Sequence, residues 1–308
     1  MNTIKLKERI TKTKTTFFLF LFISVTAFSQ ENLFVVYSLK GSVSIIDNKV
    51  ESKAKVGTLV NGNASIKVGS GSFATLICNE TKMFSLNKAG NYSAASLKDS
   101  CTGKNSSVSA NYMKYIWTEL TKSKGSPEKN RKYYMSNVGA VSRGGINNVW
   151  IDPKLDTVNY VSGTIPLSWK SYTDAEEFEF KLYDENKTVL FSKTVKKKHI
   201  DIADLLKTIQ VGKWYLWTAN IKGEPDNEDK KVLQYISKET YNSFYSKIKK
   251  HEAAESDAEQ NFRLGFALEE GHYLAESYIH YLKATQLAPD NPMYRSVFMS
   301  FKKDYEIK

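Results

Sequence analysis

Cysteine and histidine are scarce in this chain, whose 308 residues include two cysteines and four histidines. The sequence also lacks C-x-x-C, H-E-x-x-H and G-x-S-x-G motifs and a glycine-rich phosphate-binding loop, which mark common redox, metal, hydrolytic and nucleotide sites. His272 and His280 are not joined by a third ligand nearby, and we interpret the histidines as surface residues. We therefore expect a protein without catalytic activity, cofactor or metal.

Long hydrophobic runs are missing after residue 29. The apolar run at residues 17–28 follows a basic head and is shorter than the roughly 20 residues that span a bilayer. Ala27 and Ser29 are small residues at the positions that a signal peptidase recognises. The sequence predicts a signal peptide at residues 1–29, cleaved between Ser29 and Gln30, and a periplasmic or secreted mature chain without a transmembrane segment. No cysteine stands beside the cleavage site, which argues against a lipid anchor.

Basic residues outnumber acidic ones by 44 to 33, and the formal net charge is +11. Five basic residues and one acid belong to the signal peptide, so the mature charge falls to +7 (11 − 5 + 1). The remaining lysines are spread out except for a run at residues 193–199. We interpret this run as the solvated side of a hairpin, with polyanion binding as the alternative. Nucleic acid is not an expected partner outside the cytoplasm.

Residues 30–104 alternate short apolar segments with glycine and asparagine turns, which predicts a small all-β domain. Turns such as Asn61-Gly62 adopt positive φ readily and let the chain reverse at short intervals. The expected strands are residues 33–39, 42–47, 64–68, 73–78 and 83–86.

Three motifs of this domain follow one another in a fixed order. They are Gly41-Ser-Val-Ser-Ile45, then Val56-Gly-Thr-Leu-Val-Asn-Gly62, then a strand, glycine-rich turn and strand at residues 65–76. In this order they resemble the FecR-type periplasmic domain. The resemblance implies an envelope protein, and it leaves FecR-type signalling as an alternative function. This chain departs from typical members because it has neither their cytoplasmic helical segment nor their membrane span.

The two cysteines, Cys78 and Cys101, both fall in this domain, one at the end of a predicted strand and one in a loop. In an exported chain such a pair most simply forms a disulfide. Spacing alone cannot fix the geometry, so the alternative is a buried thiol at Cys78 and an exposed one at Cys101. We expect the bridge.

Residues 105–132 are predicted to form a helix followed by a linker. Tyr112, Ile116 and Leu120 recur at helical spacing and give residues 109–120 an apolar stripe. Residues 121–130 are rich in lysine and are broken by Gly125 and Pro127, which is typical of a linker.

Residues 133–238 carry the densest strand signal and predict a β-sandwich. Phe178, Phe180 and Leu182 alternate with charged residues, so one face of their strand is expected to be dry. We expect Trp169 and Trp217 in the core. The expected strands are residues 138–142, 164–170, 177–183, 188–194, 199–202, 213–221 and 231–236.

The segments P-L-x-W, F-x-F-x-L-Y-D and G-K-W-Y-L-W-T-A of this domain resemble a fibronectin type III or immunoglobulin-like module. The resemblance implies that Tyr215 bonds back across a corner of the fold. Such folds serve many unrelated functions, so the resemblance indicates no activity.

Residues 239–308 change to a helical period and predict an all-α segment. Residues 264–292 resemble one tetratricopeptide repeat, in which Gly265, Ser277 and Ala284 let two helices approach and Pro289 ends the second. About three repeats make a stable solenoid, so this segment is either a docking surface or a structural cap. The predicted fold class is multidomain, with two all-β domains and a tetratricopeptide-like all-α segment.

Five aromatic residues are candidates for an interaction surface. They are Trp150, Trp214, Tyr273, Tyr278 and Tyr281. Together with the signal peptide and the binding-type folds, they favour a non-catalytic exported adaptor or scaffold that binds other envelope proteins. Exposed indoles also stack on sugar rings, so the alternative is a glycan- or cell-wall-binding module that uses Trp150 or Trp214.

Overall fold

The computed structural model describes residues 32–78, 80–102, 108–121, 125–136, 148–152, 155–251 and 253–307. Residues 32–308 form one compact unit. The predicted signal peptide, with Ser29 and Gln30, and the predicted strand at residues 138–142 lie outside the described residues. Among the described residues, no helix has the length and hydrophobicity of a membrane span.

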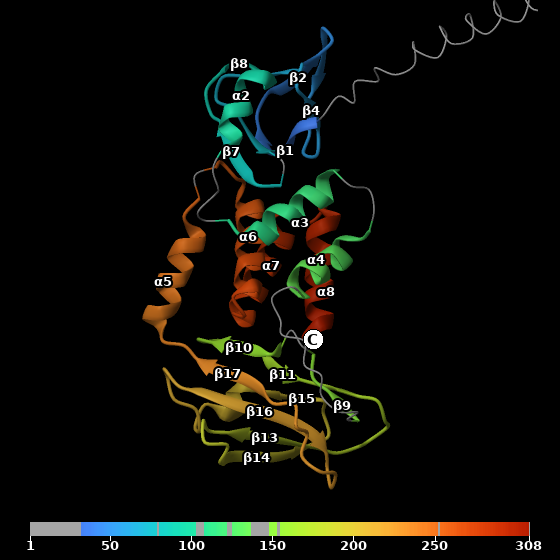
Figure 1. Cartoon of the computed structure of the whole chain (residues 1–308), viewed down its shortest axis with the longest axis vertical. Helices are drawn as coiled ribbons and strands as arrows, with labels where there is room; N and C mark the ends of the chain where they lie inside the picture. Colours follow the sequence, from blue (N-terminus) through green and yellow to red (C-terminus); the bar gives the residue numbers. More distant parts are fainter. Residues whose placement is uncertain are drawn as a thin grey trace, which may run out of the picture. The chain divides into compact units, whose positions relative to one another are not determined.

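Two antiparallel four-stranded sheets make the first part of this unit, with strand orders β4-β1-β6-β7 and β3-β2-β5-β8 (Figure 1). The predicted strands of this region are present, and β3, β4 and β8 are additional. The strands are β1 (Asn32–Lys40), β2 (Val43–Asp47), β3 (Val50–Lys53), β4 (Leu59–Asn61), β5 (Ser65–Val68), β6 (Phe73–Cys78), β7 (Lys82–Leu86) and β8 (Gly90–Ser93).

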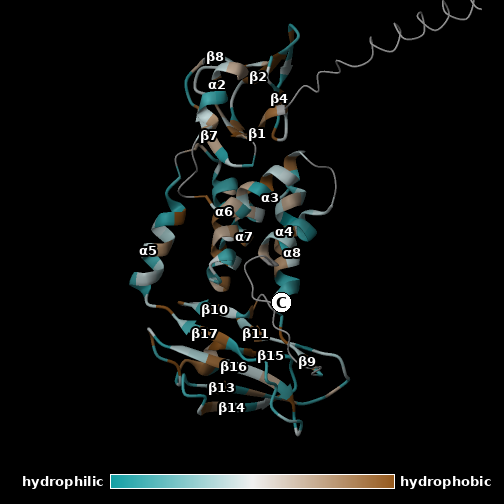
Figure 2. Cartoon of the chain, in the orientation of Figure 1, coloured by the Kyte–Doolittle hydropathy of each residue, from teal (hydrophilic) through white to brown (hydrophobic). Residues whose placement is uncertain are grey.

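Strand β1 is buried on both faces because its alternate side chains enter two different cores. Phe34 and Val36 pack in the core of the two sheets, whereas Val35 and Tyr37 belong to the large core that includes the helices. Burial on both faces explains why the apolar run of β1 is unbroken rather than alternating. Figure 2 shows this strand as largely hydrophobic.

A disulfide joins Cys78 of β6 to Cys101, so the predicted bridge is confirmed. Cys101 ends the 3-10 helix η2 (Lys98–Cys101), which follows the short helix α2 (Ala94–Leu97). The bridge spans a sequence separation of 23 residues. Closing a loop of about this length stabilises a fold by roughly 3 kcal/mol.

A helical layer lies next to the first sheets. It contains α3 (Ala110–Thr121), α4 (Pro127–Ser136), α6 (Asp257–Glu270), α7 (Leu274–Leu287) and α8 (Pro292–Asp304). Helices α3 and α4 precede the second β-region in the sequence, whereas α6, α7 and α8 follow it. Nevertheless α3 packs on α6 and on β1, and α4 packs on α8 (Figure 1). The layer is thus assembled from two segments that the second β-region separates.

Helix α4 begins within residues 121–130, which were expected to be a linker, and that expectation is wrong from Pro127 onwards. The helix continues to Ser136, so residues 133–136 are helical and do not belong to the expected β-sandwich. Proline suits the first turn of a helix, where its missing N–H has no partner to lose. The carbonyl of Ser126 accepts hydrogen bonds from the backbone N–H groups of Lys129 and Asn130. The central inward-facing residue is Arg131, which a search for apolar periodicity counts as a surface residue.

The second β-region has a five-stranded sheet of order β10-β17-β16-β13-β14 and two pairs, β11-β15 and β9-β12. Strands β9 and β10 were not predicted, and β10 pairs with β17 in parallel. The strands are β9 (Val149–Trp150), β10 (Thr157–Tyr160), β11 (Pro166–Ser168), β12 (Lys170–Ser171), β13 (Phe178–Tyr183), β14 (Val189–Val195), β15 (His199–Asp201), β16 (Trp214–Ile221) and β17 (Lys231–Tyr235), with the 3-10 helix η4 (Ile202–Leu205) after β15.

The expected core of this region is confirmed. Phe178, Phe180 and Leu182 are all buried on one face of β13, and Trp169 and Trp217 stack against Phe180. The Tyr215 hydroxyl accepts a hydrogen bond from the Gln210 backbone N–H at 2.8 Å, which gives the expected bond back across a corner.

The α6–α7 hairpin packs closely through small residues, as predicted. A Cβ atom at Gly265 would lie 2.8 Å from the Tyr281 ring, and the Ser277 hydroxyl donates to the Gly265 carbonyl at 2.8 Å. Asn291 caps α8, and Pro292 occupies its first turn. Helix α5 (Lys238–Lys249) precedes this hairpin and covers part of it.

Candidate functional site

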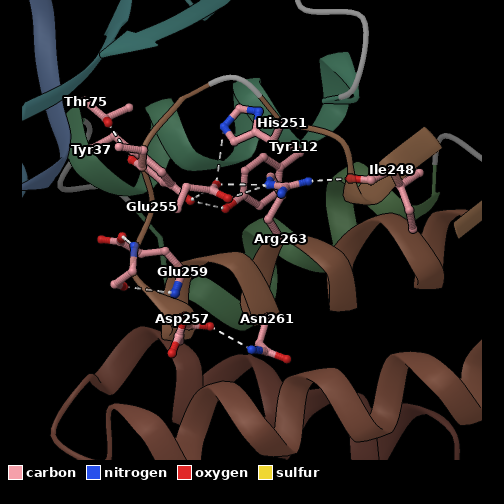
Figure 3. Close-up of polar contacts among 12 residues, drawn as sticks. Tyr37, Thr75, Tyr112, Ile248, His251, Glu255, Asp257, Glu259, Asn261 and Arg263 are labelled. Atoms are coloured by element: carbon pink, nitrogen blue, oxygen red, sulfur yellow. Dashed lines mark hydrogen bonds and ion pairs between the residues drawn. The ribbon is translucent and has the colours of Figure 1, made fainter. Parts of the chain in front are cut away.

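Four buried side chains meet where the first sheets contact the helical layer (Figure 3). This junction cluster consists of Tyr37 from β1, Tyr112 from α3, Arg263 from α6, and Glu255, which lies just before α6. The Arg263 Nε donates to both Glu255 carboxylate oxygens, at 2.9 and 3.0 Å. The Tyr37 hydroxyl donates to Glu255 at 3.1 Å and is 2.9 Å from the Tyr112 hydroxyl. One carboxylate thus links a strand, a loop and a helix.

The loop that carries Glu255 is also held by its backbone. The Ala254 N–H donates to the Ser85 hydroxyl at 2.7 Å, and the Ala254 carbonyl accepts from the Thr75 hydroxyl at 2.5 Å. Arg263 donates to the Ile248 carbonyl at 2.7 Å. Two strands and two helices therefore fix the position of this loop.

Burial sets the protonation behaviour of the junction cluster. It raises the pKa of Glu255, and the neighbouring Arg263 and Tyr37 offset part of that rise. Burial also raises the pKa of the Tyr37 and Tyr112 hydroxyls, so both are neutral hydrogen-bonding groups at neutral pH. It opposes the charge on Arg263, but the adjacent Glu255 raises the pKa of the guanidinium overall.

A second buried centre joins α4 to the other helices. In this arginine cluster, Arg131 of α4 pairs with Glu269 of α6 and with Asp304 of α8, the latter at 2.5 Å. The side chains of Arg131, Glu269 and Asp304 are 0%, 1% and 6% exposed. The hydroxyls of Tyr281 and Tyr305 donate to Glu269 at 2.9 and 3.0 Å. A buried carboxylate is stable only when its oxygens are paired in this way.

Both clusters connect elements that are distant in sequence. In each cluster, a buried carboxylate accepts hydrogen bonds both from a guanidinium and from tyrosine hydroxyls of other helices or strands, which fixes the orientation of those elements. The arrangement is therefore that of a structural tie rather than a reactive group presented to a substrate.

The sequence analysis missed Arg131 and Arg263, although a signal for them exists. The chain has five arginines among its 44 basic residues. Both of these arginines are buried, at 0% and 1% exposed. Arginine suits buried pairing better than lysine because its fork binds carboxylates in a fixed plane. A rare arginine in a lysine-rich chain was thus a usable indication of a buried ion pair.

Two of the five aromatic residues predicted to form an interaction surface are buried inside the chain. Tyr273 is 5% exposed and packs on Tyr241 and Phe244 of α5. Tyr281 is 1% exposed because its hydroxyl turns inward to Glu269. The prediction is wrong for both, since their partners come from α5 and from the arginine cluster, which the local sequence does not indicate.

The other three aromatic residues remain accessible to different degrees. Trp214 is 42% exposed. It lies on the face of β16 opposite to the buried Tyr215 and Trp217. Trp150 is half-buried, and the Lys170 ammonium lies 5.4 Å from its ring. Tyr278 is half-buried and packs on Phe298, with ring centroids 5.4 Å apart. Of these three residues, Tyr278 lies on α7, whereas Trp150 and Trp214 lie in the second β-region.

Exposed apolar side chains occur on the solvent side of both α7 and α8. Ile279 of α7 and Met299 of α8 are each 58% exposed, and Tyr278, Leu282 and Phe298 of the same two helices are partly buried. We call these five residues the outer helical face. Leu282 lies four residues after Tyr278 and three after Ile279, so it neighbours both on the surface of α7, and the Tyr278–Phe298 contact joins this surface to α8.

The expectation that the histidines lie on the surface is wrong for His251 and for His280. The His251 side chain is 5% exposed, and its Nε2 lies 3.6 Å from the Glu255 carboxylate. His280 lies between α5 and α6. Its Nδ1 is 2.9 Å from the Asn261 side-chain oxygen, and its Nε2 is 3.3 Å from the Tyr245 hydroxyl. Burial, aided by Lys283 and Lys249, lowers the pKa of His280 to about 4. Burial also lowers the pKa of His272.

In the part of the chain that the structure describes, no three histidine, cysteine or acidic side chains converge as they would around a metal ion. Comparison with known proteins finds no matching family model and no similar curated protein.

Proposed function

We propose that this protein is a non-catalytic exported adaptor or scaffold that binds other proteins of the cell envelope. The outer helical face carries this proposal. The exposed apolar surface of Ile279 and Met299 is removed from water only when another molecule covers it. A cluster of such residues is typical of a site for protein–protein contact.

The rigidity of the helices supports the same function. The arginine cluster ties α4, α6 and α8 together, and Tyr281 of α7 joins it through Glu269. A surface held in this way needs little ordering when a partner binds, which favours affinity. The expected export follows from the predicted signal peptide at residues 1–29 and places the partners in the envelope.

A photo-crosslinking residue in place of Ile279 tests the proposal in the producing cells. We expect a discrete adduct between the mature chain and another envelope protein. Val50 provides the matched control, because it is also an exposed aliphatic residue, at 68%, but lies on β3. No adduct at position 279, or the same adducts at both positions, would count against the adaptor function.

A second candidate function is glycan or cell-wall binding, and the exposed indole of Trp214 favours it. Trp214 stands opposite Gln234 of β17, so an aromatic ring and an amide lie side by side on one sheet. Indoles stack on sugar rings, and amides bond to their hydroxyls. Retention on purified cell-wall polysaccharide should fall in Trp214→Ala and persist in Trp150→Ala; unchanged retention in both variants would exclude this function.

A further inference from the structure

The charges around the outer helical face are mainly positive. Within residues 274–304, all of which the structure describes, the exposed cations are Lys283, Arg295 and Lys303. Lys302 is half-buried, and its ammonium lies 5.9 Å from the Phe298 ring. The apolar side chains are therefore bordered by positive charge.

The acidic residues of the same two helices do not balance these cations. Glu276 and Asp304 are buried, at 8% and 6% exposed, and Asp304 is already paired with Arg131. Asp290 is the exposed acid within residues 274–304 and lies in the loop between α7 and α8. Glu128 of α4 accepts a hydrogen bond from Ser296 of α8, so these two acids face four cations. A partner that binds here would meet an apolar stripe with a basic border.

We infer that the outer helical face binds an acidic amphipathic helix of a partner protein. This inference rests on the proposed adaptor function and names the chemistry of the partner. An amphipathic helix presents apolar residues at i, i+3, i+4 and i+7, which match an apolar stripe on a helical pair. Glutamates and aspartates beside that stripe would face Lys283, Arg295 and Lys302, and opposite charges at the edge of an interface speed association and select the partner.

A second copy of this chain does not fit the same surface. A two-fold interface places each patch on its own equivalent. Lys283, Arg295 and Lys303 would then approach the same cations of the other copy, and like charges in an interface are unfavourable. A polyanion would satisfy the cations but would leave Ile279 and Met299 uncovered.

Two synthetic peptides test the inference on the mature protein, residues 30–308. Both are about 18 residues long, which is five helical turns, and they share one stripe of leucine and phenylalanine. One carries glutamate at the remaining positions, and the other carries lysine. In fluorescence anisotropy we expect the glutamate peptide to bind at least about tenfold more tightly, with an affinity that falls as salt is added.

Substitutions locate the binding site. Ile279→Ser should weaken binding of the glutamate peptide by about tenfold through lost apolar contact, and the double variant Lys283→Glu with Arg295→Glu should do so through charge. Lys207→Glu is the matched control, because Lys207 is an exposed lysine outside the hairpin and should leave binding unchanged. All of these side chains are exposed, so the fold should tolerate the changes.

Three results would overturn the inference. They are equal binding of the two peptides, equal binding of polyglutamate without apolar residues, and binding that Ile279→Ser leaves unchanged. Equal binding of polyglutamate would identify a polyanion site instead. If crosslinking at position 279 captures a protein while the glutamate peptide fails to bind, the adaptor function stands and the acidic helix is excluded.

Discussion

Arginine and lysine occupy different places in this molecule. Arg131 and Arg263 are buried and bound to carboxylates, whereas most described lysines are at least partly exposed. Lys231 is a buried exception, 3.0 Å from Asp229. Because burying a charge is costly unless it is paired, the partners of these cations are as important as the cations themselves.

Removing the Arg131 side chain should strongly destabilise the protein. Arg131→Ala leaves Glu269 and Asp304 buried with a lost counter-charge, and we expect the free energy of unfolding to fall by about 3–5 kcal/mol in urea denaturation. Lys132→Ala is the control. Lys132 also pairs with Asp304, but its side chain is 41% exposed, so the loss should stay below about 1 kcal/mol. Equal losses in the two variants would contradict the role given to the arginine cluster.

The hydrogen bonds of His280 explain why it stays neutral. The Asn261 amide nitrogen donates to the Asp257 carbonyl at 2.7 Å, which turns the amide oxygen toward His280. Nδ1 therefore carries the proton, and Nε2 accepts from the Tyr245 hydroxyl. Protonating Nε2 would remove this acceptor and place a charge near Lys283 and Lys249.

This histidine should make stability depend on pH. Its pKa is about 4 in the folded protein and 6.5 in the reference state, so the unfolded chain binds the extra proton first. The contribution is present above pH 6.5 and is lost as the pH falls towards 4, on the order of 2 kcal/mol for a partly buried ring. Glu255, whose pKa is raised by burial, acts in the opposite direction.

Urea denaturation at a series of pH values can isolate this effect. The wild type should lose stability relative to His280→Gln as the pH falls from 6.5 to 4, because glutamine keeps a donor and an acceptor without titrating. Parallel pH profiles of the two proteins would show that His280 is not the titrating group.

At the scale of elements, local sequence patterns predicted the buried side chains correctly where burial depends on a single strand or hairpin. The alternation in β13 placed Phe178, Phe180 and Leu182 correctly, because a strand with one dry face has a period of two. The small residues of the α6–α7 hairpin and the Cys78–Cys101 pair were also informative without their surroundings.

Local patterns failed where burial depends on a distant partner. Helix α4 has few apolar residues, and its place in the layer depends on Glu269 and Asp304, more than 130 residues further along the chain. Tyr273 was expected to be exposed because α5 was not placed against it. The parallel pairing of β10 with β17 likewise joins residues that no hairpin turn connects. Trp214 is the most exposed of the five candidate surface residues.

Truncation tests how far the helical elements depend on one another. Deleting residues 237–308 removes α5 to α8, which uncovers Tyr115 and Tyr112 on α3 and strips Arg131 of its partners. We expect the shortened protein to aggregate, as judged by soluble yield and size-exclusion chromatography. A matched chain that ends at Tyr305 should remain soluble. A soluble, cooperatively folded truncation would show that the tail is a separable docking segment.

At the scale of the whole molecule, one large core joins regions that were expected to be separate domains. It includes Val35 and Tyr37 of β1, Tyr112 of α3, Trp217 of β16 and Phe301 of α8. Residues that share a core gain their burial energy together, which makes their unfolding cooperative.

Calorimetry of the mature protein should therefore show a single transition. We expect the calorimetric and van't Hoff enthalpies to agree within error, which is the test of all-or-none unfolding. Two resolved transitions would mean that the first sheets or the second β-region unfold independently of the helical layer.

The discontinuous helical layer also determines when folding can finish. Helices α3 and α4 are synthesised before the second β-region, but their packing partners α6 and α8 come last. During synthesis, the apolar side of α3 has no helix to pack on, and the guanidinium of Arg131 has no carboxylate to pair with, until the residues near the carboxyl end have been made. A partly made chain therefore cannot complete the helical layer, and the apolar side of α3 stays exposed until the last helices have formed, which favours aggregation of the unfinished chain.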